Sequence, residues 1–359
     1  MRRVVLILGA NGFIGSHLAE RLIGETGWDV IGIDVASHRL ERFGRRGGFE
    51  FIRLDLETDF DKVDSLIRCS DVVLPLVAIA TPQSYVHDPL RVFELTFEAN
   101  LRVIRSCVEY GKRVVFASSS EVYGMCSGER FDESASTLVL GPIEKHRWIY
   151  ACSKQLLDRV IHAYGLEGRL RYTIFRPFNW IGEGLDDVHA SREGSSRVLT
   201  QFIGNVLRGE DICLVDGGAQ RRCFLYVDDA IDCLTRILEN PSGVADQQIF
   251  NVGDPAGEMS IRQLAETVLE LARGYPGLAS RARQLRYLDV PAERYYGEGY
   301  QDMERRRPSI ARAQALLGWQ PKTPLRMALA RTVDPYFRAP GPVRPRVEAD
   351  AGEREVALG

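Results

Sequence analysis

A buried strand followed by regularly spaced glycines constrains the fold of this chain more than any other stretch. Val4–Leu8 is a continuous apolar run, typical of a central parallel strand that is covered on both faces. The sequence then reads GANGFIG, and a helical pattern follows over residues 16–22. Such glycines allow a tight turn and let a pyrophosphate approach the helix N-terminus. The pattern predicts a nucleotide-binding unit, although a turn without a phosphate would share it. The expected cofactor contacts are Gly9, Asn11, Gly12, Phe13, Ile14 and Gly15.

A carboxylate follows the second predicted strand. The apolar residues 30–33 end at Asp34, about 20 residues past the glycines. A carboxylate there can accept hydrogen bonds from the adenosine ribose and would repel a 2′-phosphate. We therefore expect NAD and not NADP, with a helix cap as the alternative role of Asp34. Asp55, at the end of a third strand over 51–56, is expected near the adenine. Two further NAD contacts are expected in the fourth strand, over 72–78: Leu76 and Ala78.

Strands and helices alternate through residue 180, which predicts a doubly wound, Rossmann-like parallel sheet. We expect residues 1–180 to form this NAD-binding domain and residues 181–338 a smaller α/β lobe for the substrate, with some segments returning to the sheet. Residues 339–359 have hardly any apolar side chains and predict a disordered tail. Other expected features are helices over 60–68, 90–110, 198–208, 228–240 and 260–273, strands over 113–117, 212–215 and 248–252, a functional loop over 182–196, a surface or cleft-lining loop over 293–308 and a last helix ending near residue 337.

Tyr150 and Lys154 stand four residues apart in a helical stretch, so they share one face of the helix. An ammonium beside a phenol favours the phenolate, which would make Tyr150 a base for a sugar hydroxyl. Upstream, the sequence SSSEVYG places Ser119, Ser120 and Glu121 at the end of an apolar strand. These features together indicate redox chemistry on an alcohol. The alternatives are ordinary helix-surface residues and a capping role for the serines, Ser118 in particular.

Composition limits the possible partners. Of the 359 residues, 45% are hydrophobic and 26% charged, with a formal net charge of −3. No apolar run approaches the roughly 20 residues that span a bilayer, and the balance of charge argues against a nucleic-acid surface. The seven cysteines show no Cys-x-x-Cys or Cys/His spacing, so neither a disulfide framework nor a metal site is expected. A cytoplasmic protein is the default expectation.

With these motifs in place, the chain resembles an extended short-chain dehydrogenase/reductase that acts on a nucleotide sugar. It is more closely similar to the UDP-glucuronate decarboxylase domains of bacterial polymyxin-resistance enzymes, over nearly the whole chain apart from the tail. Those enzymes also have a formyltransferase domain, and formyl transfer is not expected here. The runs that carry the closer resemblance are LPLVAIATP (74–82), SEVYGMC (120–126), RWIY (147–150), FRPFNW (175–180), LVDGGAQ (214–220) and YYGEGYQD (295–302).

The resemblance implies roles for individual residues. Ser119 would help to hold the reacting oxygen, Ser120 and Glu121 would face the substrate carboxylate, and Arg306 would approach from the other side as a proton donor or binder. Arg306 is separated from its neighbours in the run 305–307 by the match alone. A homodimer formed through helices 90–110 and 150–164 is also implied. The residues matched to the UDP-sugar, here UDP-glucuronic acid, are Tyr85, Asn179, Arg197, Arg221, Arg222 and Tyr300.

The expected reaction is oxidation of the sugar at C4, followed by loss of carbon dioxide from the β-keto acid, which gives UDP-4-keto-pentose. Partial re-reduction to UDP-xylose remains open. UDP-apiose/UDP-xylose synthases share much of the pattern but carry cysteines where this chain has Ala80 and Ser120. A UDP-glucuronate 4-epimerase or a dehydratase would keep all the carbons. A protein that senses NAD as a scaffold is the non-enzymatic alternative, and the Tyr150-x-x-x-Lys154 motif argues against it.

Overall fold

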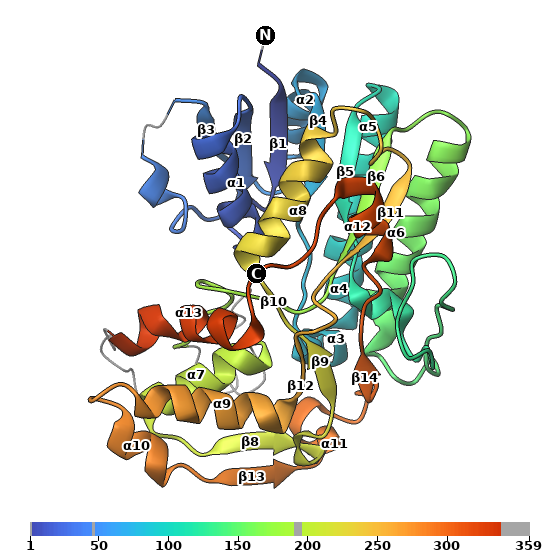
Figure 1. Cartoon of the computed structure of the whole chain (residues 1–359). Helices are drawn as coiled ribbons and strands as arrows, with labels where there is room; N and C mark the ends of the chain where they lie inside the picture. Colours follow the sequence, from blue (N-terminus) through green and yellow to red (C-terminus); the bar gives the residue numbers. More distant parts are fainter. Residues whose placement is uncertain (1, 45–46, 190–195, 339–359) are drawn as a thin grey trace.

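The computed structural model describes residues 2–44, 47–189 and 196–338. In Figure 1 a parallel sheet with helices on both faces occupies the upper half of the molecule, and a smaller group of helices and short strands lies below it. The predicted tail and residues 190–195 of the predicted 182–196 loop lie outside the described residues. Within the described residues, no helix is both long and apolar enough to cross a membrane.

The main sheet has seven strands: β1 (Val4–Leu8), β2 (Asp29–Asp34), β3 (Phe49–Arg53), β4 (Val72–Pro75), β5 (Arg113–Ala117), β6 (Tyr172–Pro177) and β11 (Gln248–Val252). All neighbours are parallel, in the order β11-β6-β5-β4-β1-β2-β3. The chain order reverses between β1 and β4, and ligands of such sheets bind at the carboxyl ends of the strands near this switch point. The predicted doubly wound, Rossmann-like fold is confirmed.

Helices cover both faces of this sheet, because its central strand is apolar on both sides. Val5 and Ile7 of β1 enter one core cluster, whereas Leu6 and Leu8 enter another. The first cluster is shared with α1 (Phe13–Glu25) and α8 (Val227–Glu239), and the second with α2 (Phe60–Cys69), α5 (Asn100–Glu109) and α6 (Trp148–Leu166).

The prediction of one long helix over residues 90–110 is wrong in one respect: the structure divides this stretch into three helical segments. It consists of α4 (Pro89–Phe93), a π-helical turn η2 (Glu94–Ala99) and α5. The side chain of Asn100 explains the break: Nδ2 donates to Leu95 O and Thr96 O, both at 3.1 Å, and to Val77 O at 2.9 Å. The wider turn thus ties the helix to the chain beyond β4.

Two strands also differ from their predicted limits. β3 covers residues 49–53, so Asp55 follows the strand instead of ending it. β4 ends at Pro75, which has no N–H to donate to a neighbouring strand, so Leu76 and Ala78 lie in the loop that follows.

The second group of elements is α7 (Val198–Arg208), β8 (Ile212–Val215), η4 (Asp216–Gly218), β9 (Arg221–Cys223), β12 (Glu258–Ser260), α9 (Ile261–Arg273), α10 (Ala279–Gln284), β13 (Tyr287–Val290), α11 (Ala292–Tyr296), β14 (Arg305–Arg306) and α13 (Leu325–Arg338). β8 pairs with β13, and β9 lies between β12 and β14. The segment predicted as a loop over 293–308 contains α11 and β14, and its Tyr300, Met303 and Arg306 are buried. β11 and α8 return to the main sheet between these elements.

The remaining short elements are η1 (Glu41–Phe43), α3 (Pro82–His87), η3 (Ser120–Tyr123), β7 (Trp180–Ile181), β10 (Leu225–Tyr226) and α12 (Ala311–Leu317). α3 and η3 follow β4 and β5, and both lie at the carboxyl edge of the sheet, where the second group of elements faces it. This edge therefore holds the predicted site residues.

Candidate active site

The glycine loop adopts the conformation that a dinucleotide requires. Gly9 has φ of +88°, which favours glycine, and a Cβ atom on Gly15 would lie 2.4 Å from Gly9 O. The helix therefore begins directly against the turn. Gly12 is the N-cap of α1 and offers no side chain to the first-turn N–H groups, and no acidic residue lies in that turn. These N–H groups are available to a pyrophosphate, so the residues fit NAD.

Asp34 supports the same loop. One of its carboxylate oxygens accepts a hydrogen bond from Asn11 N at 2.9 Å, and the other accepts from Ala36 N at 3.2 Å. Burial raises the pKa of Asp34, and these backbone donors oppose that effect. Asp34 thus braces the turn while it stands at the end of β2, where a ribose would lie. A helix-cap role is not what the structure shows.

The other residues predicted to contact NAD lie along this edge. Val77, between Leu76 and Ala78, is the nearest neighbour of Gly9: a Cβ on that glycine would lie 3.3 Å from it. Asp55, after β3, accepts from Glu57 N at 2.8 Å. The loops after β1 and β4 therefore lie against each other at the switch point, and Asp55 lies at the same edge of the sheet, after its outermost strand.

Tyr150 and Lys154 lie on the buried face of α6, with 6% and 1% of their surface exposed. Lys154 Nζ donates to Ala117 O at 2.7 Å and lies 5.9 Å from the centre of the Tyr150 ring. Burial lowers the pKa of Lys154 to about 8. Burial also raises the pKa of Tyr150, while a hydrogen bond with Ser119 lowers it. Burial thus dominates the pKa of Tyr150, while Nζ of Lys154 bonds to the backbone of β5.

The serine cluster divides into separate roles. Ser119 Oγ accepts from Glu121 N at 3.1 Å and also bonds to Tyr150, so it caps η3 and belongs to the site. Ser118 points elsewhere and donates to Asp158 at 2.9 Å, so the capping role considered for it is not observed. Ser120 is buried beside them.

A buried cluster of charged groups stands next to Tyr150. Glu121 accepts from Arg147 through one oxygen and from Arg306 through the other. Asp302 is paired with Arg222 at 2.5 Å, and its other oxygen lies 3.4 Å from Arg306 and 3.6 Å from Arg147. We call these five residues the arginine cluster. Its three guanidinium groups exceed its two carboxylates by one charge.

Both carboxylates of the arginine cluster are ionised. Burial alone would raise the pKa of Glu121, but Arg147 and Arg306 hold it well below the usual range. The pKa of Asp302 is likewise lowered, against its burial, by Arg222, Arg147 and Arg306. The excess positive charge is therefore retained, and an anionic group of a ligand would balance it.

Aromatic rings surround the cluster. Tyr85 of α3 stacks on Tyr150, with ring centres 4.8 Å apart. The Arg147 guanidinium lies 4.6 Å from the centre of Trp148 and 5.8 Å from that of Tyr300. Tyr300 Oη donates to Asp302 at 3.0 Å. Among the residues predicted to line the sugar, Tyr85, Arg222 and Tyr300 thus lie near Tyr150 or in the cluster beside it.

The other predicted sugar ligands are placed differently. Asn179 has φ of +39°, and its Nδ2 donates to Cys223 O at 3.1 Å, at the end of β9. Arg197 makes a bidentate ion pair with Asp186, and its charge acts on Tyr85 and Tyr150. Arg221 lies 3.5 Å from Glu258 and points away from the arginine cluster, because side chains alternate along β9.

The three consecutive arginines of residues 305–307 are sorted by the same alternation. Arg306 pairs with Arg222 across β14 and β9 and is 4% exposed. Arg305 is exposed and makes a bidentate ion pair with Glu258, whereas Arg307 Nε donates to Pro255 O at 3.0 Å. Arg306 alone of the three enters the site, as the resemblance implied.

Sequence reasoning missed Arg147 and Asp302 as site residues, although both lie within runs that carried the resemblance. A charged residue in a polar loop is ordinarily solvated, and nothing local to either residue indicated burial. Arg147 immediately precedes α6, only three positions before Tyr150, and that proximity is the one signal that could have been followed.

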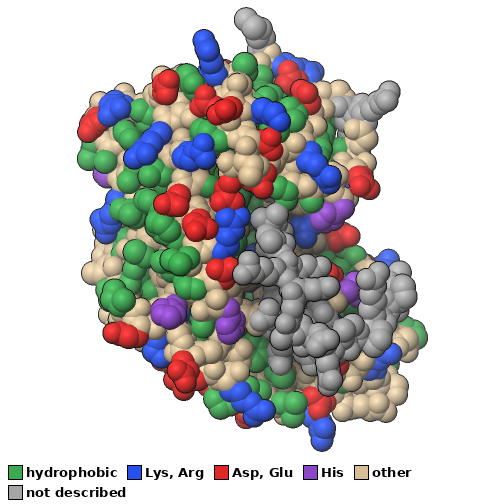
Figure 2. All heavy atoms as spheres, turned by 180° about the vertical axis from the view of Figure 1, so that it is seen from behind, with side chains coloured by type: hydrophobic (Ala, Val, Ile, Leu, Met, Phe, Trp, Pro, Cys, Tyr) green, Lys and Arg blue, Asp and Glu red, His purple; other side chains and the backbone are tan. Residues whose placement is uncertain are grey.

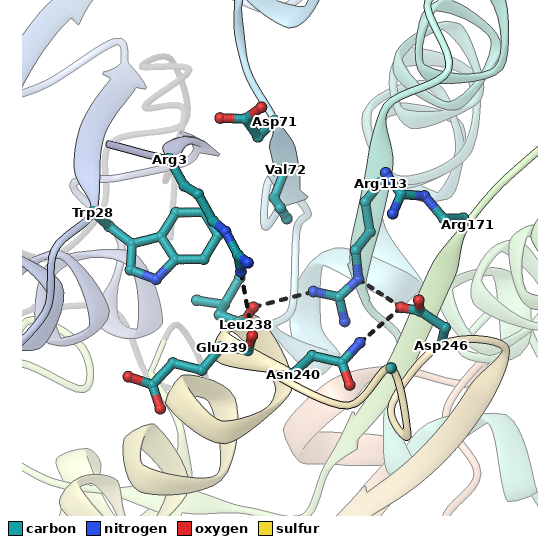
Figure 3. Close-up of a pocket in the computed structure, with 11 residues that line it drawn as sticks. Arg3, Trp28, Asp71, Val72, Arg113, Arg171, Leu238, Glu239, Asn240 and Asp246 are labelled. Carbon is teal, nitrogen blue, oxygen red and sulfur yellow. Dashed lines mark hydrogen bonds and ion pairs between the residues drawn. The ribbon is translucent and has the colours of Figure 1, made fainter. Parts of the chain in front are cut away.

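A cavity of about 340 Å³ lies at the opposite edge of the sheet, where β4 and β5 begin (Figure 3). Its buried Arg113 donates to Ile237 O and Leu238 O and pairs with Asp246 at 2.9 Å. Arg113 therefore caps the carboxyl end of α8. Its guanidinium group is paired with other residues of the protein, so it is not aimed at a ligand in this cavity. In the described part of the chain, no group of three His, Cys, Asp or Glu side chains is arranged to hold a metal.

Residues 5–253 match the NAD dependent epimerase/dehydratase family, and the chain belongs to this family. It is an enzyme of the extended short-chain dehydrogenase/reductase fold with NAD as its cofactor, as the sequence predicted. Among solved structures, the PbgP3 protein from Burkholderia pseudomallei is 49% identical with a TM-score of 0.86, over 94% of this chain and 97% of that chain.

Two more distant structures share the fold. UDP-glucuronic acid 4-epimerase from Bacillus cereus, solved with UDP-glucuronic acid and NAD, is 22% identical with a TM-score of 0.76, over 92% of this chain and 98% of that chain. UDP-glucose 4-epimerase from Thermotoga maritima, solved with UDP-glucose, is 23% identical with a TM-score of 0.72, over 92% of this chain and 97% of that chain. At these identities the similarity shows the fold alone.

Proposed function

We propose that this enzyme oxidises UDP-glucuronic acid at C4 and decarboxylates it, forming UDP-4-keto-pentose. The observation that carries the proposal is the arginine cluster beside Tyr150, which holds one more positive charge than negative within a buried site. A buried charge without a partner is costly, and a sugar carboxylate would supply the missing anion. The resemblance to UDP-glucuronate decarboxylases supports the same substrate.

In the first step Tyr150 accepts the proton of the C4 hydroxyl. NAD, when bound, supplies the acceptor for the hydride from C4. Burial favours the neutral phenol, so the Ser119 hydrogen bond is important for reaching the phenolate. Tyr85, stacked on Tyr150, limits the movement of the phenol and excludes water from that side.

In the second step the C5–C6 bond of the uronate breaks and carbon dioxide leaves. The bonding electrons enter an enolate whose oxygen is that of the C4 ketone, and C5 then takes a proton. Arg306 and Arg147 would orient the carboxylate for this cleavage. Glu121 is held ionised between them, so it cannot donate the proton directly. A water molecule relayed along Glu121 is the source we favour, because guanidinium groups hold their protons tightly.

A 4-epimerase is the second candidate, because UDP-glucuronic acid 4-epimerase has the same fold and binds a uronate with the carboxylate retained. It needs the same anion site but no loss of carbon. Release of the keto sugar and return of the hydride to form UDP-xylose are both compatible with the residues present. Apiose formation is disfavoured by Ala80 and Ser120 in place of cysteines.

The test is product analysis with UDP-glucuronic acid and NAD⁺, combining mass spectrometry with absorbance of NADH. Decarboxylation predicts a pentose nucleotide and carbon dioxide, with stoichiometric NADH if the keto sugar is released. A product of unchanged carbon number would overturn the proposal in favour of epimerisation. Arg306→Ala should abolish carbon dioxide release while NAD still binds, and Arg305→Ala, its exposed neighbour, is the matched control.

A homodimer and a cytoplasmic location are part of the same proposal. Exposed leucines lie along the helices expected to form the dimer: Leu90 in α4 is 72% exposed, and Leu156 on α6 is 45% exposed. Figure 2 shows hydrophobic side chains gathered along the left side of the back view, the side to which α5 and α6 turn. Light scattering after size exclusion should give twice the chain mass, and Leu156→Asp should give a monomer.

A further inference from the structure

A buried carboxylate lies one helical turn beyond Lys154. Tyr150, Lys154 and Asp158 follow at four-residue spacing and share one face of α6, and Asp158 is 4% exposed. Its Oδ2 accepts from Ser118 Oγ at 2.9 Å and from Arg176 at 3.0 Å. Its Oδ1 is buried and has no hydrogen-bond partner among the described residues. A half-satisfied buried carboxylate is uncommon and calls for an explanation.

The charges around Lys154 supply the first part of that explanation. Lys154 Nζ has Ala117 O and the Phe116 ring, 4.7 Å away, as its neighbours from β5. Asp158 is the charged group that favours its protonated form, against burial. Other titratable groups near the pair are Tyr150 on α6, Glu121 on η3, Tyr172 and Arg176 on β6, and Arg197 at the start of α7. Burial raises the pKa of Asp158, and Arg176 and Ser118 oppose that effect.

The backbone at the end of β5 supplies the second part. Ser118, held by Asp158, lies between two residues that touch the reacting pair: Ala117, whose carbonyl accepts from Lys154, and Ser119, which bonds to Tyr150. The Asp158–Ser118 hydrogen bond thus fixes residues 117–119, which make the contacts with Lys154 and Tyr150. Arg176 extends the network, because it also donates to Tyr123 Oη at 3.0 Å.

We propose that Asp158 is a positioning residue for the reaction: it holds residues 117–119 against α6 and places a negative charge one helical turn from Lys154. It touches neither sugar nor cofactor and acts through Lys154 and Ser119. The inference rests on Tyr150 and Lys154 being the reacting pair. It does not depend on which sugar is oxidised or on whether carbon dioxide is lost.

The first test is the pH profile of kcat for NADH formation, with whichever nucleotide sugar the enzyme oxidises. Asp158→Asn removes a negative charge near both Lys154 and Tyr150, so both limbs of the profile should move about one unit to lower pH. Asp158→Glu should restore the position of the limbs. Asp229→Asn is the control, since it neutralises a buried carboxylate on α8 that accepts from Lys322 N and Thr323 N and has no bond to the Asp158 network. A purely structural role predicts a uniform loss with unshifted limbs, which would overturn the proposal.

The second test needs no turnover. The pKa of Lys154 is lower in the folded protein than its ordinary value near 10.5, so its titration should make the free energy of unfolding rise between about pH 8 and pH 10.5. Subtracting the curve of Lys154→Met isolates this contribution. In Asp158→Asn the rise should begin about one pH unit lower, and an unchanged onset would contradict the proposal.

If Asp158→Asn does not fold, Ser118→Ala must lower kcat with KM unchanged. A wild-type kcat in Ser118→Ala would overturn the positioning role.

Discussion

The phenol rings of Tyr85 and Tyr150 lie parallel, 4.8 Å between centres and 7° between planes. Tyr85 comes from α3 and Tyr150 from α6, so the stack joins the segment after β4 to α6. Both rings are buried, with Tyr85 2% and Tyr150 6% exposed, so the stack is closed to solvent. The Tyr150 phenol therefore has a neighbouring ring as well as its own helix to position it.

Replacing Tyr85 tests this restraint. Tyr85→Ala should lower kcat at least about tenfold, because the phenol can leave its reactive position, and should cost about 3–5 kcal/mol of stability through the cavity. Tyr85→Phe keeps the ring, so its kcat should stay near wild type while KM for the sugar rises. Steady-state kinetics and urea unfolding provide the measurements. Equal kcat for the two variants would show that the stack does not position Tyr150.

The hydrogen bond between Ser119 and Tyr150 predicts a pH effect. The pKa of Tyr150 is raised by burial and lowered by Ser119, and the base works in its deprotonated form. The rate should therefore increase with pH above neutrality, and Ser119→Ala should move this increase to higher pH. Ser153→Ala is the control, because Ser153 is buried on the same helix and its Oγ has no partner among the described residues. An unshifted profile for Ser119→Ala would exclude this role.

Replacing Gly15 by alanine is expected to weaken cofactor binding. A Cβ there would lie 2.4 Å from Gly9 O, so Gly15→Ala must push the helix away from the turn that holds the pyrophosphate. NAD affinity, measured by calorimetry, should fall at least about tenfold. Gly24→Ala, later in α1, meets no atom within 4 Å. It should leave NAD binding unchanged and stabilise the helix by about 0.5–1 kcal/mol. Similar affinities in the two variants would refute the tight-turn argument.

Replacing Glu121 by glutamine is expected to lower the free energy of unfolding by an amount that depends on pH. Glu121→Gln leaves Arg147 and Arg306 without their shared anion, which should cost about 3–5 kcal/mol near neutral pH. The pKa of Glu121 is lower in the folded protein than in the unfolded chain, so its contribution is present above about pH 4.3 and is lost as the pH falls further. The gap between the two unfolding curves should therefore narrow in acid.

The control for this prediction is Glu270→Gln, which removes the carboxylate of an exposed bidentate pair with Arg326. Exposed pairs contribute about 0–1 kcal/mol, so this change should be small at every pH. If the two variants lose the same amount of stability, the buried position of Glu121 has no special energetic role.

Local sequence patterns were sufficient to predict much of the fold of this protein. The β1–glycine–α1 unit, the carboxylate of Asp34 and the pairing of Tyr150 with Lys154 each depend on residues close in sequence, where spacing dictates geometry. The break in the predicted 90–110 helix could not be read in this way, because Asn100 bonds to Val77, which only the folded sheet brings near. The arginine cluster likewise joins residues from 121 to 306.

The alternation along β14 has a consequence for changes in chain length. Arg306 faces the site only because its register against β9 turns Arg305 and Arg307 elsewhere. Deleting one residue between Asp302 and Arg305 would leave all three arginines in the sequence but would present a different one to Glu121, or none. Among relatives of this enzyme, a gap in that short segment would thus mark a lost contact with Glu121 even where every arginine is still present.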